Sequence, residues 1–442
     1  MMNVKIQTTL RRPFMERLTD HLIVISFDCL SSLDFPLLEA LPNFQKLLRN
    51  SSYCKNVQTI YPSVTYPCHA TIVTGKLPKN HGIINNTLLQ PGKVSPDWYW
   101  YRRDIQGTTL YDEAKQKGMS TAALLWPVTA KANIDYNMPE IFANRRWHHQ
   151  IPVSLMNGSS LYQLEMNKKF GHIRKGLSQP ELDDFVLEAA VETIRLKKPN
   201  LMLIHFTDLD TKRHETGFSS KEAISAIKRH DHRLGRITDA LQSAGIFHQS
   251  TIIALGDHSA LDESKVLKPN VLFREHDLLQ VGKNNQVTNW KAYCKSCDGS
   301  AYIYIQDQDQ ETLTRVRELL DRSEIEAIWS SKEASQFGAD PNCSLMIEAA
   351  KGYYFHESLE GAFIDEVTET DVASKKYSKA CHGYSPEKSD YDTLFIASGN
   401  GIRTGQALTS MRLIDEGPTL ARLLGLDLGA VDGRVLEELL IL

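Results

Sequence analysis

A threonine stands at the expected start of a helix, and its neighbours suit a nucleophile. Within residues 61–75, Pro62 favours an extended lead-in and Pro67 is tolerated in the first turn of a helix. The helix would then end at Gly75. Unpaired amides and the positive dipole end at its start favour an anion beside the hydroxyl of Thr65. A simple helix cap is the structural alternative. We interpret Thr65 as a nucleophile.

An acidic residue closes the first apolar run of the chain. Residues 21–27 are rich in β-branched and apolar side chains, a pattern typical of a strand buried on both faces of a parallel sheet, and Asp28 follows directly. Ligands collect at the carboxyl ends of strands in open α/β sheets, so this carboxylate is well placed for chemistry. A cap on the following helix is an equal alternative.

Two later apolar runs lead into clusters of acid and histidine. Asp210 and His214 stand four residues apart, so on a helix they could converge on one ion. Asp257 and His258 are adjacent at the end of another expected strand. Both side chains would be desolvated there without an obvious partner, which is unusual for packing.

Two further segments could contact a ligand. Asn86 ends a Gly- and Asn-rich connection and could donate to an oxyanion, although turn formation is the ordinary reason for such residues. The aromatic cluster 97–101 is either a satellite core or a platform on which a ligand ring stacks. We expect substrate contacts from Tyr66, Trp98 and Trp100.

Strands and helices alternate through the middle of the chain, as a doubly wound α/β fold requires. The expected strands are 121–125, 200–206, 250–255 and 392–397, and the expected helices are 181–197, 220–244 and 417–425. From 265 to 379 the alternation is replaced by short strands around a helix at 311–320. We therefore expect a catalytic core formed by 1–264 and 380–442, with an inserted smaller α+β cap lobe at 265–379.

Composition and charge indicate which ligands and which cellular setting the chain suits. The 442 residues carry a net charge of −4, which gives no basic field for a nucleic-acid polymer but allows a small anionic substrate. Residues 1–20 have no apolar core of a signal peptide, and no apolar run is long enough to span a bilayer. Seven cysteines suit reduced thiols, and the lone pair Cys294 and Cys297 has no further zinc ligands nearby. These features predict a cytoplasmic protein without a membrane partner.

The chain order of the candidate groups resembles that of the alkaline phosphatase superfamily, and most closely its nucleotide pyrophosphatase/phosphodiesterase family. The matching segments are Phe27-Asp28, 62–75, 82–86, Asp210 with His214, Asp257-His258 and His382-Gly383-Tyr384. The resemblance runs from about residue 21 to about residue 400, and the cap lobe is least covered.

The resemblance implies an alkaline-phosphatase-like fold with two divalent metal ions. Asp210, His214 and His382 would hold one ion. Asp28, Asp257 and His258 would hold the other, with the Thr65 oxygen bridging to it. Imidazole and carboxylate ligands without thiolate suit zinc, and manganese or iron would also fit this ligand type.

The implied activity is hydrolysis of phosphodiester or pyrophosphate bonds in nucleotide-like molecules through a phosphothreonine, with Asn86 and the Thr65 amide binding the developing charge. Departures from the family are few, since Asn85 replaces a frequent Asp and Tyr66 a frequent Phe. Phosphonoacetate hydrolase and phosphomonoesterase are alternatives within the superfamily. A catalytically silent binding protein is an alternative from another class, and the complete ligand set argues against it.

Overall fold

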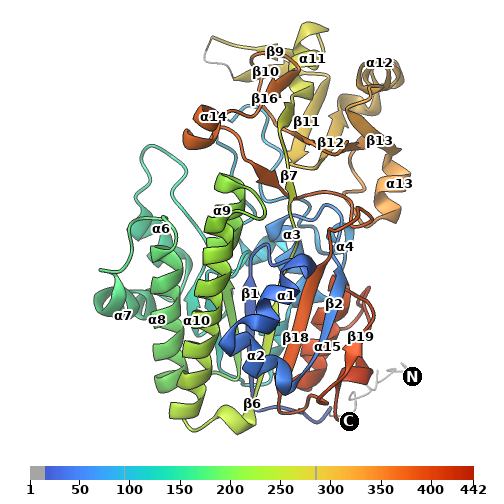
Figure 1. The fold of residues 1–442 in the computed structure, drawn as a ribbon. Coiled ribbons are helices and arrows are strands. Elements are labelled where there is room, and N and C mark those ends of the chain that lie inside the picture. Colours follow the sequence, from blue (N-terminus) through green and yellow to red (C-terminus); the bar gives the residue numbers. More distant parts are fainter. Residues whose placement is uncertain (1–14, 94, 284–285) are drawn as a thin grey trace, which may run out of the picture.

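A nine-stranded sheet forms the centre of the molecule in the computed structural model, which describes residues 15–93, 95–283 and 286–442 (Figure 1). The strand order is β19-β2-β18-β6-β1-β5-β3-β4, and β20 also pairs with β2. All neighbours are parallel except β18, which runs antiparallel to β2 and β6. The strands are β1 His21–Phe27, β2 Ser51–Gln58, β3 Thr121–Leu124, β4 Tyr136–Met138, β5 Leu201–Phe206, β6 Ser250–Leu255, β18 Thr393–Gly399, β19 Ala407–Leu408 and β20 Met411–Arg412.

Helices cover both faces of this sheet (Figure 1). Successive side chains of a strand point to opposite faces, so Ile23 and Ile25 of β1 pack into one apolar core while Leu22 and Val24 pack into the other. The first core includes side chains of α2 Pro42–Arg49, α8 Glu181–Lys197 and α10 Lys221–Ser243. The second includes side chains of α3 Thr65–Thr74, α5 Leu110–Gln116 and α15 Glu416–Leu423. The expectation of a doubly wound, mostly parallel sheet is confirmed.

Further helices connect these layers. They are α1 Phe35–Ala40, α4 Pro78–His81, α6 Gln150–Asn157, α7 Ser160–Phe170 and α9 Asp208–Thr216. The pair α6 and α7 was not expected from the sequence, and neither was β2. No helix among the described residues is both long and apolar enough to cross a bilayer. Residues 1–14, part of the N-terminal segment considered above, lie outside the described residues.

Small sheets stand together at one end of the molecule, beyond the carboxyl end of β1 (Figure 1). One is the four-stranded antiparallel sheet β11-β12-β14-β13, and another is β15-β8-β16. Their elements are β7 Leu261–Asp262, β8 Lys265–Leu267, α11 Pro269–Glu275, β9 Leu279–Val281, β10 Val287–Trp290, β11 Ala292–Cys297, β12 Ser300–Ile305, α12 Gln310–Leu320, β13 Ile325–Ser330, α13 Ser331–Gln336, β14 Leu345–Ala349, β15 Tyr353–Phe355, β16 Ile364–Glu366, α14 Glu369–Ala373 and β17 Ala380–Cys381. Most of them fall within 265–379, but an independent cap lobe with those boundaries stays a prediction.

Candidate active site

The candidate ligands gather where three neighbouring strands end. β6, β1 and β5 are adjacent and parallel, so their carboxyl ends meet at one edge of the sheet. Asp28 follows β1, Asp257 and His258 follow β6, and Asp210 lies in the first turn of α9 after β5. His382 reaches the same place from the segment after β17. The topology therefore brings together residues that are up to 354 positions apart in the chain.

Thr65 is the first residue of α3 and does not cap it. The N-cap position is Val64, which has extended backbone and a side chain that makes no capping hydrogen bond. The Thr65 hydroxyl oxygen lies instead 3.3 Å from Nε2 of His258. Gly75 ends the helix with a φ of 65°, the left-handed conformation that favours glycine. The hydroxyl is thus free of a structural role and faces the acid–histidine cluster.

Among the groups of three side chains whose donor atoms lie within 4.8 Å of one another, two share no residue. In the first, Oδ1 of Asp210 lies 3.2 Å from Nε2 of His214 and 3.9 Å from Nε2 of His382. In the second, Nε2 of His258 lies 3.4 Å from Oδ1 of Asp28 and 3.3 Å from Oδ2 of Asp257. These are the same two sets that the family resemblance implies.

The donor set fits two divalent cations. Several buried donor atoms have no hydrogen-bond partner: Asp28 Oδ1, Asp210 Oδ1, Asp257 Oδ2, His214 Nδ1 and His382 Nδ1. Burial and the neighbouring charges of Asp257 and Asp210 raise the pKa of Asp28 well above its ordinary value. Buried carboxylates that repel one another are stabilised by bound cations, and carboxylate with imidazole is an ordinary zinc ligand set.

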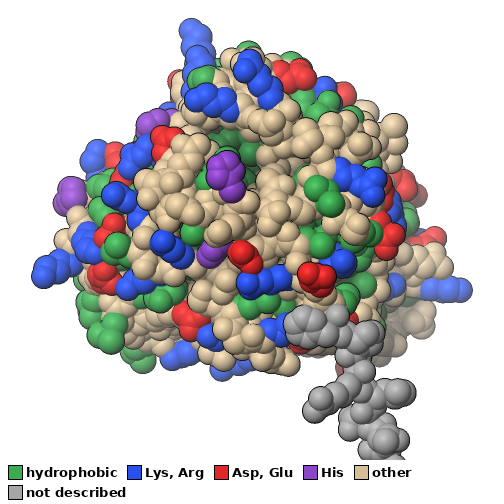
Figure 2. All heavy atoms as spheres, turned by 90° about the horizontal axis from the view of Figure 1, so that it is seen from below, with side chains coloured by type: hydrophobic (Ala, Val, Ile, Leu, Met, Phe, Trp, Pro, Cys, Tyr) green, Lys and Arg blue, Asp and Glu red, His purple; other side chains and the backbone are tan. Residues whose placement is uncertain are grey.

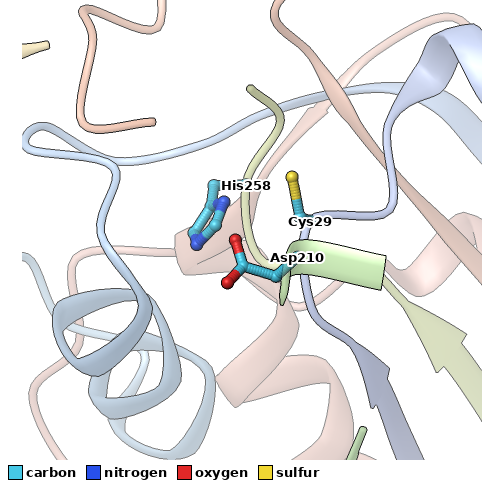
Figure 3. A group of neighbouring side chains, drawn as sticks. All are labelled: Cys29, Asp210 and His258. Carbon is cyan, nitrogen blue, oxygen red and sulfur yellow. The ribbon is translucent and has the colours of Figure 1, made fainter. Parts of the chain in front are cut away.

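Cys29 lies beside both groups (Figure 3). Its sulfur comes within 4.8 Å of donor atoms of Asp210 and His258, and the Asp210 carboxylate points toward the His258 ring in that view. Burial raises the pKa of the Cys29 thiol well above its ordinary value, although Arg213 opposes the shift. Because Asp210 and His258 already belong to the two groups above, Cys29 does not form a separate third site.

Asn86 is fixed beside the nucleophile. The backbone N–H of Tyr66 donates to its Oδ1 at 2.9 Å. Its amide nitrogen donates to no acceptor among the described residues, and the side chain lines the main cavity. An unused donor next to Thr65 is suited to an oxyanion.

The cavity has a volume of about 940 Å³ and reaches from the acid–histidine cluster to α6 and α7. Trp98 lines it, held by edge contacts with Tyr66 and Phe142 at ring-centroid distances of 5.2 and 5.0 Å. Tyr66 also lines the cavity, and its hydroxyl donates to Oε1 of Glu140 at 3.3 Å.

Trp100 has a different environment from Trp98. It is not among the described residues that line the cavity, and its ring packs edge-on against Phe142 in an apolar cluster. Only 5% of Trp100 is exposed. This placement favours packing over ligand stacking, against the expectation from the sequence.

Several functional candidates were not predicted. Nε2 of His205 lies 3.1 Å from Oδ2 of Asp28, and its Nδ1 lies 3.2 Å from Oε2 of Glu140. Nε2 of His69 lies 3.0 Å from Ser26 Oγ, and its Nδ1 lies 2.8 Å from the carbonyl oxygen of Thr65. The available signal was a histidine inside each of two apolar segments, 201–206 and 64–75. His205 therefore orients the Asp28 carboxylate that would bind metal, whereas His69 holds the backbone of Thr65.

The Cys294 and Cys297 pair has no shared site. Both lie on β11, three positions apart, so they point to opposite faces of that strand. Cys294 packs in the apolar core of the small sheets, while Asn85 Nδ2 donates to Sγ of Cys297 at 3.0 Å.

Known proteins resemble this chain in sequence and in fold. The family model described as type I phosphodiesterase / nucleotide pyrophosphatase matches residues 22–385. Human ectonucleotide pyrophosphatase/phosphodiesterase family member 1 is 25% identical over 229 residues, which are 49% of this chain and 21% of that protein. Venom phosphodiesterase 2 of Crotalus adamanteus is 24% identical over 229 residues, covering 49% and 24%. The chain thus spans a quarter or less of the length of these curated relatives.

Solved structures share the fold over nearly the whole chain. Murine ectonucleotide pyrophosphatase/phosphodiesterase 5 gives a TM-score of 0.67 at 18% identity, covering 96% of this chain and 100% of that one. The human protein of the same name gives 0.67 at 18%, covering 95% and 99%. The family match extends over most of the residues that form the central sheet and the candidate site. The chain therefore belongs to the type I phosphodiesterase / nucleotide pyrophosphatase family.

Proposed function

We propose that this protein hydrolyses phosphodiester or pyrophosphate bonds of nucleotide-like small molecules through a phosphothreonine at Thr65, with two bound divalent cations. The observation that carries the proposal is the Thr65 hydroxyl, 3.3 Å from His258 Nε2, at the start of a helix and beside two groups of metal donors. The named relatives are phosphodiesterases and nucleotide pyrophosphatases. The murine neighbour was also solved as an inactive threonine-to-alanine variant in complex with AMP, which supports a nucleotide-like substrate here.

The two cations, which we propose to be zinc, would be held by Asp210, His214 and His382 and by Asp28, Asp257 and His258. When bound, such ions lower the pKa of a neighbouring hydroxyl and neutralise charge on the attacking and departing oxygens. His205 would keep the Asp28 carboxylate in position, and the Cys29 backbone N–H, which donates to Oδ1 of Asp257 at 3.0 Å, would do the same for Asp257.

The proposed reaction consists of two successive displacements at phosphorus. The Thr65 hydroxyl gives its proton to solvent water and its oxygen attacks phosphorus, so that a bond to Thr65 forms as the bond to the departing alkoxide breaks. The alkoxide takes a proton back from solvent water. Water then attacks the phosphothreonine, which releases the second product and restores the hydroxyl. The Asn86 amide and the Thr65 backbone N–H would donate to the non-bridging oxygen that gains charge in each step.

The test uses Thr65→Ala and Thr65→Ser with the 4-nitrophenyl ester of thymidine 5′-monophosphate. We expect Thr65→Ala to lose at least about 10³-fold in kcat, since the variant lacks the hydroxyl that would form the covalent intermediate. Metal content and the circular dichroism spectrum should match wild type, because six other side chains supply the ligands. Thr65→Ser should keep measurable turnover and yield an acid-stable phosphoserine peptide. Turnover by Thr65→Ala within about tenfold of wild type would contradict the nucleophile assignment.

Metal removal tests the cofactor assignment separately. A chelator should abolish turnover, and zinc should restore more of it than manganese because half of the donors are imidazoles. Full activity in metal-free protein would refute metal dependence, and recovery with manganese alone would refute zinc.

A further inference from the structure

Large apolar side chains are exposed on α6, α7 and the loops beside them. Six of the twelve exposed large hydrophobic residues of the described chain fall between 147 and 177. They are Trp147, Ile151, Met156, Leu161, Leu164 and Leu177. Single exposed apolar residues are normal, but such a concentration marks an interaction surface. We name residues 145–177 the α6–α7 surface.

The helix α7 is apolar on two faces. Tyr162 and Met166 pack into the main core, against elements that include α8. Leu161, Leu164 and Lys168 recur at three- and four-residue intervals on another face, where Leu161 is 84% exposed. This second face is mixed, since Lys168 follows the two leucines, and no described segment covers Leu161.

The same surface is strongly basic in an acidic protein. Residues 145–177 contain six Lys or Arg and one acidic residue, whereas the whole chain has a net charge of −4. Arg145, Lys169 and Lys175 are paired with carboxylates. Arg146, Lys168 and Arg174 have no carboxylate within ion-pair distance among the described residues. By contrast, Figure 2 shows the end of the molecule opposite the small sheets, where Lys and Arg are interspersed with Asp and Glu.

The α6–α7 surface also borders the candidate active site. Ile151 and Leu164 are exposed and at the same time line the cavity that contains Thr65. Leu155 and Leu177 continue this apolar lining. Whatever binds the surface would therefore lie at the mouth of the cavity.

We propose that the α6–α7 surface binds the anionic surface of a lipid bilayer. Its apolar side chains would enter the boundary between headgroups and acyl chains, and its unpaired cations would contact lipid phosphates. A second copy of the chain is a poorer partner, because a two-fold interface would place two basic patches against each other. The proposal is independent of the hydrolytic activity and replaces the expectation of no membrane partner.

The test measures sedimentation of the 442-residue chain with sucrose-loaded vesicles. The vesicles contain phosphatidylcholine alone or with about 30% phosphatidylglycerol, in about 0.1 M and about 0.5 M NaCl. We expect partitioning onto anionic vesicles to exceed that onto neutral vesicles at least about tenfold and to fall at the higher salt concentration.

Matched variants test whether vesicle binding depends on this surface or on exposed apolar side chains in general. Met156→Ser/Leu161→Ser, which leaves the cavity lining intact, should lose at least about tenfold in partitioning. The control Leu33→Ser/Ile224→Ser removes two exposed apolar residues elsewhere and should stay within about twofold of wild type. Hydrolysis of the soluble thymidine diester by both variants should be unchanged, which shows that they are folded.

Three results would overturn the proposal. The first is equal partitioning of wild type onto the two vesicle types. The second is wild-type partitioning by the Met156→Ser/Leu161→Ser variant. The third is a lipid-free dimer of wild type that this variant abolishes, since the surface would then be an interface between copies of the chain.

Discussion

The backbone N–H of Tyr66 donates to Oδ1 of Asn86, at 2.9 Å, and this bond determines which end of the amide faces the cavity. Because the oxygen is used by the backbone, the nitrogen is left to donate. Tyr66 directly follows Thr65 in α3. The same helical turn therefore carries the proposed nucleophile and the anchor of the proposed oxyanion donor.

Asn86→Asp should lower kcat/KM for the thymidine diester at least about 10²-fold. The variant keeps the oxygen that accepts from Tyr66 but replaces the donor with a carboxylate oxygen that repels the phosphate. We expect the melting temperature to change little for the same reason. Steady-state kinetics and a thermal melt on one preparation check both parts. Wild-type kcat/KM in Asn86→Asp would show that the amide does not contact the reacting group.

Trp98→Ala should raise KM for a nucleotide diester more than for bis(4-nitrophenyl) phosphate. Trp98 lines the cavity, and stacking on a base contributes about 1–3 kcal/mol, so a five- to tenfold difference is expected. Trp100→Ala is the matched control, because this ring is packed away from the cavity. It should lower stability by about 3 kcal/mol or more while affecting both substrates equally. The same KM change for both substrates in Trp98→Ala would mean that Trp98 also serves only packing.

Glu348 of β14 joins the small sheets to two segments of the active site. Its Oε2 accepts from the Tyr61 hydroxyl at 2.6 Å, and its Oε1 accepts from the Ser385 backbone at 3.0 Å. Tyr61 precedes the helix of Thr65, and Ser385 follows His382. Burial raises the pKa of Glu348 from an ordinary 4.5 to about 7, although these hydrogen bonds oppose the shift.

Replacing Glu348 by Gln should therefore change how stability depends on pH. Between pH 4.5 and about 7, the folded protein keeps a proton on Glu348 that the unfolded chain has already lost. The contribution of this proton to the stability of the fold is therefore complete below pH 4.5 and is lost as the pH rises to about 7. The free energy of unfolding of wild type minus that of Glu348→Gln should fall by roughly 2–3 kcal/mol between about pH 5 and about pH 8. Urea unfolding of both proteins gives this difference. A constant difference across the range would contradict the raised pKa.

Elements with a clear hydrophobic pattern were predictable from the sequence, and contacts between distant segments were not. The strands β1 and β6 and the helix α8 begin and end at the predicted residues, because each is an apolar or periodic run bounded by polar residues. The helix α7 was not recognised, since apolar residues on two of its faces remove the simple helical period.

Within the site, too, the sequence indicated the residue types but not the contacts between distant segments. The chain order of acids and histidines indicated the metal donors. Nothing in the sequence placed His205 against Asp28, which is 177 positions away, because that contact follows from the pairing of β1 with β5. Trp98 and Trp100 are alike in sequence context, and only the fold distinguishes the lining ring from the packed one.

The cations near Thr65 indicate which phosphate esters the site can accept. Arg174 is the single Lys or Arg among the described residues that line the cavity, and its Nη2 donates to Asn167 on α7. Lys295 lies close to the Asn86 segment, but its ammonium donates to Thr87 and to the carboxylate of Glu357, which compensates its charge. The donor next to the nucleophile is the neutral amide of Asn86. Apart from Arg174, which is hydrogen-bonded to α7, the described cavity lining therefore offers a phosphomonoester dianion no Lys or Arg for its additional charge.

We predict that diesters are hydrolysed faster than monoesters, by at least about tenfold in kcat/KM, or ~1.4 kcal/mol. A diester carries one charge fewer, and its substituent can lie against the apolar wall that includes Trp98 and Phe142. The comparison uses 4-nitrophenyl phosphate and the 4-nitrophenyl ester of thymidine 5′-monophosphate on one zinc-loaded preparation. Lys295→Met provides the control, because a hidden role of this cation would lower monoester turnover selectively. The prediction is wrong if kcat/KM of wild type for the monoester equals or exceeds that for the diester. If Lys295→Met then also loses monoester turnover selectively, the site is one for monoesters and Lys295 binds their second charge.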